Sequence, residues 1–306
     1  MINRIKNRLF KSSTVKKQLS EVCDNLTMLR AKSNVVVLYG SPTESNWLGV
    51  ANVTQSLYKD ISVEIPQVYS NPVFPPDQIK IVCQKITELK YEKVIISGFA
   101  FYFFDFIDNL YEACRVQTFF QGTISEFHSP DTQKMIQHLI RYSKEGKIHH
   151  LSFLKKGLEK VFTDLYGFEA SHQPSGSPVI PANISLIKTD PSKIHIGVFG
   201  WDTFNKNLHN QVIYALMNPN TVVHVQDKSI FSYLELGDRI IEHGQALPKE
   251  KFLSVLGAMD LNLYMSYSES WGLVAYESEA MGVPCLRMDD LDYYNKIKKS
   301  IESKRF

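Results

Sequence analysis

Short runs of β-branched and apolar residues recur along the chain and alternate with segments whose apolar residues repeat every three or four positions. The first pattern is typical of parallel strands that are buried on both faces, and the second of amphipathic helices. In the first half the patterns predict strands at residues 34–39, 63–68, 93–98 and 116–120, with helices at 50–58 and 76–89. Residues 131–166 are expected to be mostly helical, with a break at Gly146 and a short strand around 148–153.

A stretch rich in Pro, Ser and Gly at residues 171–181 interrupts this pattern and is typical of a linker. After it the alternation restarts, with strands predicted at 193–199, 221–225, 240–243, 261–265 and 284–288 and helices at 208–217, 248–259 and 273–281. Alternation of strand and helix, without consecutive strands, predicts an α/β fold with parallel sheets. The break indicates two such domains, at residues 33–187 and 188–306, behind a helical extension at 1–32.

The extension is strongly basic. Its eight Lys/Arg side chains against two acidic ones give a net charge of +6, whereas the whole chain carries only +2. Ile2, Ile5 and Leu9 form one helical repeat and the apolar residues from Leu19 to Leu29 form another. Three interpretations stay open: an interfacial helix on an anionic membrane, a docking helix for a partner, or an extension packed on the first domain. Because the overall charge is near zero, nucleic acid is not expected as a partner.

Cysteine usage and hydropathy place the protein in the cytoplasm. The four cysteines have no metal-binding or redox spacing, and no secretory signal precedes the first domain. Free thiols in a reducing compartment are the simplest interpretation. No run approaches the roughly 18 apolar residues of a spanning helix. We therefore expect a cytoplasmic protein, with peripheral contact at the inner face of the membrane if the basic helix binds lipid.

One segment near the carboxyl terminus carries candidate chemistry. Glu269 falls in the loop that leaves the strand at 261–265, and open α/β sheets bind ligands at such carboxyl ends. Gly272 permits close backbone approach, and the amides of Gly272, Leu273 and Val274 at a helix start form a site for a diphosphate. Glu277 lies about one turn into that helix. Its carboxylate can accept hydrogen bonds from the two vicinal hydroxyls of a ribose, and Glu269 can do the same for sugar hydroxyls.

This segment resembles the retaining GT-B glycosyltransferases. Glu269 and Glu277, with seven residues between them, match the Glu-x7-Glu signature of that family, and Gly282 and Pro284 stand where its glycine and proline follow. The resemblance implies two Rossmann-like domains with parallel sheets facing a central cleft. It assigns acceptor binding to the first domain and nucleotide-sugar binding to the second, shorter one.

The resemblance also implies roles for particular residues. The family's phosphate-binding lysine follows the first strand of the second domain, where Lys206 stands, so Lys206 and Glu269 are the catalytic candidates. Glu277 is expected to contact ribose. The full set of expected donor-binding residues is Gly200, Lys206, Asn207, Ser268, Glu269, Trp271, Gly272, Leu273, Val274 and Glu277. Gly49, in the loop after the first strand, is a further candidate for backbone contact with a diphosphate.

The resemblance therefore implies a hexosyltransferase that needs neither a cofactor nor a divalent metal. Its donor is a nucleotide-sugar, with a UDP-sugar favoured over a GDP-sugar. Its acceptor is a hydroxyl of a glycan, a lipid-linked glycan or another molecule. Two alternatives stay open. One is a non-catalytic binding or scaffold subunit with the same fold, suggested by Gln121 where relatives often carry a histidine. The other is a phage-type transferase that acts on DNA.

Overall fold

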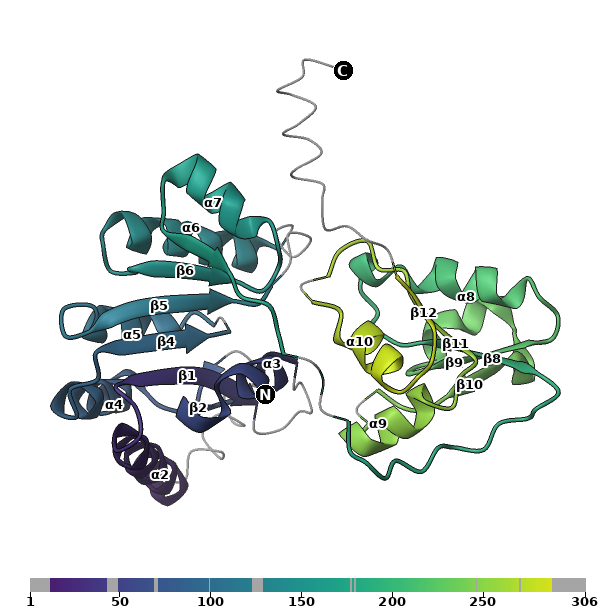
Figure 1. Ribbon diagram of the computed structural model, residues 1–306, viewed down its shortest axis with the longest axis horizontal. Helices are drawn as coiled ribbons and strands as arrows, with labels where there is room; N and C mark the ends of the chain where they lie inside the picture. The colour runs from purple at the N-terminus through teal and green to yellow at the C-terminus, as the bar shows by residue number, and fades with distance from the viewer. Residues whose placement is uncertain are drawn as a thin grey trace, which may run out of the picture. The chain divides into compact units, whose positions relative to one another are not determined.

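The computed structural model describes residues 12–42, 49–68, 71–98, 100–122, 129–176, 178, 180–245, 247–269 and 271–287. It divides into two compact units, the first ending at Gly176 and the second formed almost entirely by the residues after Gly176 (Figure 1). Each unit is built around its own sheet, with the order β3-β2-β1-β4-β5-β6-β7 in the first and β10-β9-β8-β11-β12 in the second.

The first unit has seven strands: β1 (Val35–Pro42), β2 (Ser62–Val68), β3 (Asn71–Pro72), β4 (Lys93–Ser97), β5 (Arg115–Phe120), β6 (His150–Phe153) and β7 (Ala170–His172). Its helices are α2 (Ser12–Arg30), α3 (Gly49–Tyr58), α4 (Pro76–Glu88), α5 (Phe103–Leu110), α6 (Pro130–Lys144), α7 (Leu158–Tyr166) and the short η1 (Lys59–Ile61). All strand pairs are parallel except the two-residue edge pair of β3 with β2. The predicted strands and helices of this half are confirmed within a few residues.

Helix α5 and strand β7 were not predicted, and neither were the two-residue strand β3 and the short 3-10 turns. Helix α5 is rich in phenylalanine, a residue with modest helix propensity, and it forms because Phe103, Phe106 and Ile107 are fully buried in the core. Strand β7 lies at the start of the stretch predicted to be a linker. It is held there by pairing with β6, which places Phe153 opposite His172.

Helix α2 belongs to the first unit. Val22 and Leu26 are buried in its core, and the Tyr91 hydroxyl donates a hydrogen bond to the Leu26 carbonyl at 2.7 Å. The Arg30 Nε donates to the Leu89 carbonyl at 2.7 Å. The apolar positions of this helix are therefore used for packing on the domain. The other repeat, Ile2, Ile5 and Leu9, lies outside the described residues. No helix in the described part of the chain is both long and apolar enough to span a bilayer.

The second unit is a five-stranded, all-parallel sheet: β8 (Ile194–Val198), β9 (Thr221–Val225), β10 (Ile240–Glu242), β11 (Leu261–Tyr264) and β12 (Cys285–Arg287). Its helices are α8 (Leu208–Leu216), α9 (Lys249–Leu256) and α10 (Leu273–Ala280), with short turns η3 (Phe204–Lys206), η4 (Ser229–Leu234) and η5 (Gly237–Arg239). Leu208, Val212 and Ala215 of α8 belong to one hydrophobic cluster, and Leu253, Val255 and Leu256 of α9 belong to another. Every strand and helix predicted for this half is confirmed.

The boundary between the units differs from the predicted one. Residues 178–187 were assigned to the first domain, but Ile180, Ile184 and Ile187 pack against the cluster beneath α9. The Ile187 amide also donates to the Ser254 carbonyl at 3.3 Å. This segment therefore belongs to the second unit, because its isoleucines bury their apolar surface there.

Candidate functional site

Two loops meet at the carboxyl ends of β8 and β11 in the second unit. The Tyr267 amide donates to the Asn205 carbonyl at 2.7 Å, and Asn205 Nδ2 donates to the Ser268 carbonyl at 3.1 Å. Asn207, which has a left-handed backbone with φ of 53°, donates through Nδ2 to the Met265 carbonyl at 3.1 Å. These bonds fix the loop that carries Lys206 against the loop that carries Glu269.

A buried glutamine connects the same two loops. Gln211 lies on α8, its Nε2 donates to the Lys206 carbonyl at 2.7 Å, and its Oε1 accepts from the Met265 amide at 2.9 Å. It is only 4% exposed. This residue was not predicted to belong to the site. The only sign of it in the sequence is a polar side chain on the buried stripe of the helix, between Leu208 and Val212.

Lys206 and Glu269 form an ion pair at the centre of this arrangement. Lys206 Nζ lies 2.7 Å from Oε1 and 2.8 Å from Oε2 of Glu269. The Lys206 ammonium also lies 3.4 Å from the Tyr264 hydroxyl. Burial, and secondarily the Glu269 charge, raise the pKa of Tyr264 well above its ordinary value, so this phenol is neutral. The two catalytic candidates are thus side by side and mostly shielded from solvent.

Helix α10 starts beside this pair. Gly272 precedes its first residue with a φ of 79°, and a Cβ there would lie 3.2 Å from Cε1 of Tyr264. The amides of Leu273 and Val274 are at the first turn, where backbone donors lack intrahelical acceptors. Trp271 stacks on Tyr276 with ring centroids 5.0 Å apart, and its buried Nε1 has no hydrogen-bond partner among the described residues. The helix start therefore offers amide donors next to a lysine, as a diphosphate site requires.

Glu277 has a lysine partner of its own. It is 4% exposed, and its Oε1 accepts from Nζ of Lys249, the first residue of α9. Burial raises the pKa of Glu277, and the charge and hydrogen bond of Lys249 oppose that rise. Lys249 was not predicted to belong to the site, because no motif links it to a glutamate 28 positions away.

The other predicted donor residues lie in these loops, with one exception. Gly200 follows β8, and a Cβ on it would lie 3.3 Å from Leu208 Cδ2. Ser268 is half-buried and accepts the bond from Asn205. Gly49 is in the first unit, as the exposed first residue of α3, with open space where a Cβ would point. A contact of Gly49 with a diphosphate stays a prediction.

Gln121 is held inside the first unit. Its Nε2 donates to the Ser97 hydroxyl at 2.9 Å and lies 3.1 Å from the Thr54 hydroxyl, and the side chain is 7% exposed. Ser97 and Gln121 mark the carboxyl ends of neighbouring strands β4 and β5. The Gln121 side chain therefore ties the ends of β4 and β5 to α3.

Three histidines form a second polar cluster in the second unit. His195 Nδ1 lies 2.8 Å from His224 Nε2, and His224 Nδ1 lies 2.7 Å from His243 Nε2. His195 Nε2 lies 2.9 Å from the Asp190 carbonyl, which can only accept. His195 Nε2 therefore donates to that carbonyl, and Nε2 of His224 and of His243 can donate to Nδ1 of the preceding ring in the same way. Burial, and then the neighbouring histidines, lower the pKa of His224 to about 4. Within the described residues, no group of three or more His, Cys, Asp or Glu is arranged to hold a metal ion.

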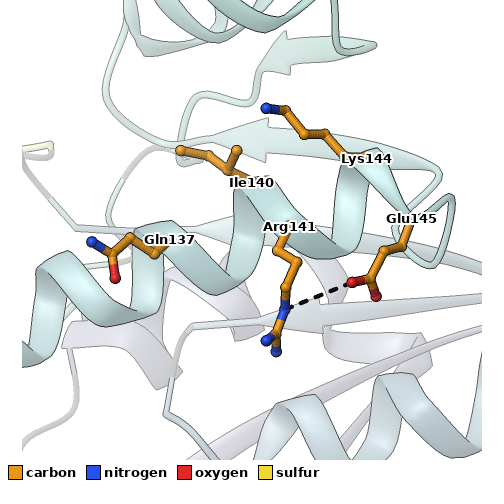
Figure 2. Close-up of a pocket in the computed structure, with 5 residues that line it drawn as sticks. All are labelled: Gln137, Ile140, Arg141, Lys144 and Glu145. Carbon is orange, nitrogen blue, oxygen red and sulfur yellow. Dashed lines mark ion pairs between the residues drawn. The ribbon is translucent and has the colours of Figure 1, made fainter.

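A separate hollow lies along α6 in the first unit. Its volume is about 410 Å³, and its lining comes from one stretch of chain, Gln137, Ile140, Arg141, Lys144 and Glu145. Figure 2 shows Arg141 paired with Glu145, at 3.8 Å, on one side of the helix. A single helix face of this kind holds no converging catalytic groups, so we place no active site there.

No family model matches the sequence, and no curated protein does. Among solved structures, the chain is similar to HepE from Anabaena in complex with UDP, with 14% identity, coverage of 89% of this chain and 90% of that one, and a TM-score of 0.59. It is similar to a UDP-forming α,α-trehalose-phosphate synthase from Burkholderia xenovorans, with 10% identity, coverage of 89% and 91%, and a TM-score of 0.54. It is also similar to sucrose-phosphate synthase from Thermosynechococcus elongatus, with 12% identity, coverage of 82% and 80%, and a TM-score of 0.53.

These similarities define the class of fold. Two Rossmann-like units with parallel sheets, matched along most of their length to glycosyltransferase structures, give the chain the GT-B fold. The predicted α/β fold with two Rossmann-like units and parallel sheets is confirmed.

Proposed function

We propose that the protein is a glycosyltransferase that moves a sugar from a nucleoside diphosphate, UDP in the first place, to an acceptor hydroxyl in glycan or polysaccharide biosynthesis. The observation that carries the proposal is the meeting of Lys206, Glu269 and the start of α10 at the carboxyl edge of the second sheet. A structural neighbour, HepE, has been solved with UDP and with UDP-glucose. The acceptor is a glycan, a lipid-linked glycan or another hydroxyl compound.

The proposed roles derive from charge and geometry. Lys206 and the amides of Gly272, Leu273 and Val274 neutralise the diphosphate as the bond from its oxygen to the sugar carbon breaks and the electron pair leaves with the nucleotide. Glu269 holds the sugar hydroxyls and Glu277 the ribose hydroxyls. The acceptor oxygen attacks the anomeric carbon from the face that the diphosphate leaves, so the anomeric configuration is retained. The proton of the acceptor hydroxyl passes to the departing diphosphate. Gly200, Asn207, Ser268 and Trp271 complete the donor site.

The proposal does not require a metal ion, since a lysine and helix amides supply the positive charge that a divalent cation otherwise provides. We also propose a cytoplasmic location, with membrane contact through the basic amino-terminal segment. Transfer assayed with EDTA and with added Mg²⁺ tests the metal requirement. Equal rates are expected, whereas activity that returns only with Mg²⁺ contradicts this part of the proposal.

A panel of UDP-, GDP- and ADP-sugars tests the function. Isothermal titration calorimetry is expected to detect binding of UDP-sugars, and slow hydrolysis of the bound donor is expected to release UDP. The product anomer, read by NMR, tests retention. If no member of the panel binds, the proposal is wrong.

A non-catalytic subunit is the second candidate. The hydrogen bonds of Gln121 to Thr54 and Ser97 favour this candidate. They hold the side chain in a structural role at a position where relatives often carry a histidine. Donor binding without hydrolysis or transfer to any acceptor in a glycan panel is the result that separates this candidate from the enzyme.

A further inference from the structure

The pairing of Lys249 with Glu277 joins two elements at the ligand edge of the second sheet. Helix α9 follows the carboxyl end of β10, and α10 follows the carboxyl end of β11. The two helices pack on each other, and the Lys249 ammonium donates to Oε1 of Glu277. The lysine side chain is 38% exposed and the glutamate side chain 5%. The cation therefore reaches in from the surface to a carboxylate that the fold has removed from water.

A buried carboxylate without a partner takes up a proton, since burial disfavours the charged form. A protonated carboxyl has one hydroxyl donor and fewer acceptor sites than the anion. Hydrogen bonds from two vicinal ribose hydroxyls are also about twice as strong when the acceptor is the anion. The charge of Glu277 thus sets how strongly it can hold a ribose.

The strands beside α10 do not supply a charge that stabilises the anionic form of Glu277. On β11, Tyr264 is neutral because burial raises its pKa well above the ordinary value. On β12, Arg287 lies 3.8 Å from Glu279, and its guanidinium covers the Tyr276 ring at 5.0 Å. Burial raises the pKa of Cys285, also on β12, to about 11, so it carries no charge. Among the described residues, the charge that opposes the effect of burial on Glu277 is that of Lys249.

We infer that Lys249 is a positioning residue of the donor site, which keeps the Glu277 carboxylate anionic and oriented so that it can accept hydrogen bonds from both ribose hydroxyls. The inference rests on the proposed function and adds a residue to it. Lys249 uses one acceptor position on Oε1, and a carboxylate offers about four, so positions for two hydroxyls remain. Lys249 itself does not need to touch the nucleotide.

The test compares UDP with 2′-deoxy-UDP, which lacks one of the two hydroxyls, by calorimetry from pH 6 to 8.5. Wild type is expected to prefer UDP. Lys249→Met is expected to weaken UDP binding about tenfold or more, the value of a hydrogen bond to a charged group, and to reduce the preference over 2′-deoxy-UDP. Its UDP affinity should rise with pH as Glu277 ionises. Lys249→Arg should restore both properties, and Lys251→Met, an exposed lysine on the same helix, should change neither.

An unchanged preference and an unchanged pH profile in Lys249→Met would show that the pair is merely structural, and the inference would be wrong while the proposed function stands. If wild type binds neither nucleotide, the proposed function itself fails and the inference falls with it. If Lys249→Met does not fold, Glu277→Gln is compared with the double variant that combines Lys249→Met and Glu277→Gln, because the double variant has no unpaired buried charge. The single variant Glu277→Gln and the double variant are expected to bind UDP with equal affinity. A further loss in the double variant would mean that Lys249 contacts the nucleotide directly, which overturns the positioning role.

Discussion

The Lys206 ammonium lies 2.7 Å from Oε1 of Glu269, although the two residues are 63 positions apart. The pair is mostly shielded from solvent, so each charge depends on the other for compensation. A diphosphate that arrives at this site meets a lysine already held in place by three hydrogen bonds, two to Glu269 and one to Tyr264. Little reorganisation is needed before that lysine can neutralise a leaving group.

Removal of the Lys206 charge should slow transfer severely. For Lys206→Ala we expect kcat to fall about 10²- to 10³-fold, as when a preorganised donor to a developing negative charge is lost. Lys206→Arg should retain part of the rate, because the charge remains and only the geometry changes. The measurement is UDP release with a matched UDP-sugar. Lys193→Ala, on an exposed lysine of the same unit, is the control, and wild-type turnover by Lys206→Ala would contradict the assignment.

Loss of the Gln211 amide should loosen both loops of the site. Gln211→Leu keeps the volume but leaves the Lys206 carbonyl and the Met265 amide without their partner. The expected cost is about 1–3 kcal/mol in the free energy of unfolding, with a lower kcat/KM for donor hydrolysis. Urea unfolding measures the first quantity. The same substitution at exposed Gln137 on α6 should leave both unchanged, and equal behaviour of the two variants would argue against this role.

Alanine substitutions at two glycines distinguish the effect of backbone strain from the effect of a side-chain clash. Gly272 and Gly282 both have a φ of 79°, but a Cβ would meet Tyr264 at 3.2 Å in the first and open space in the second. Both alanine variants should lose about 1 kcal/mol of stability for the left-handed backbone. Only Gly272→Ala should also displace Tyr264 and weaken UDP binding. Gly49→Ala, where the Cβ has open space and no left-handed φ is needed, should retain wild-type stability. Normal UDP affinity in Gly272→Ala would place the diphosphate elsewhere.

Acid should destabilise the second unit through its histidine chain. The pKa of His224 is about 4 in the fold and near 6.5 in an unfolded chain, and that of His243 is also lowered by burial. The unfolded state therefore binds more protons as the pH falls. The stabilisation is complete above pH 6.5 and is lost between pH 6.5 and 4, by about 3 kcal/mol for His224.

Urea unfolding at pH 7.5 and pH 5 measures this loss. His224→Gln, which removes the titration and keeps hydrogen-bonding groups, should flatten the dependence on pH. His209→Gln, at an exposed histidine on α8, should not change it. If the free energy of unfolding of His224→Gln falls with pH as steeply as that of wild type, the loss of stability comes from other groups.

The local pattern of apolar residues was sufficient to predict the order of strands and helices in the second unit. Buried parallel strands are continuous apolar runs, and the helices between them show a clear apolar stripe, so each element is encoded within its own few residues. The Glu-x7-Glu spacing is equally local. It places Glu269 before the helix and Glu277 within it, whatever surrounds them.

Everything that depends on a distant partner was decided by the tertiary structure. Residues 180–187 join the second unit because their isoleucines pack against the hydrophobic cluster that α9 helps to form. Helix α5 forms because the core buries its phenylalanines. Lys249, Gln211 and the three histidines carry no motif, since their significance lies in contacts with residues 19 to 54 positions away that only the stacking of strands and helices brings within hydrogen-bonding distance. Sequence periodicity records which face of an element is buried, but not which polar group lies on the neighbouring element, and that pairing gives each carboxylate of the signature its own lysine.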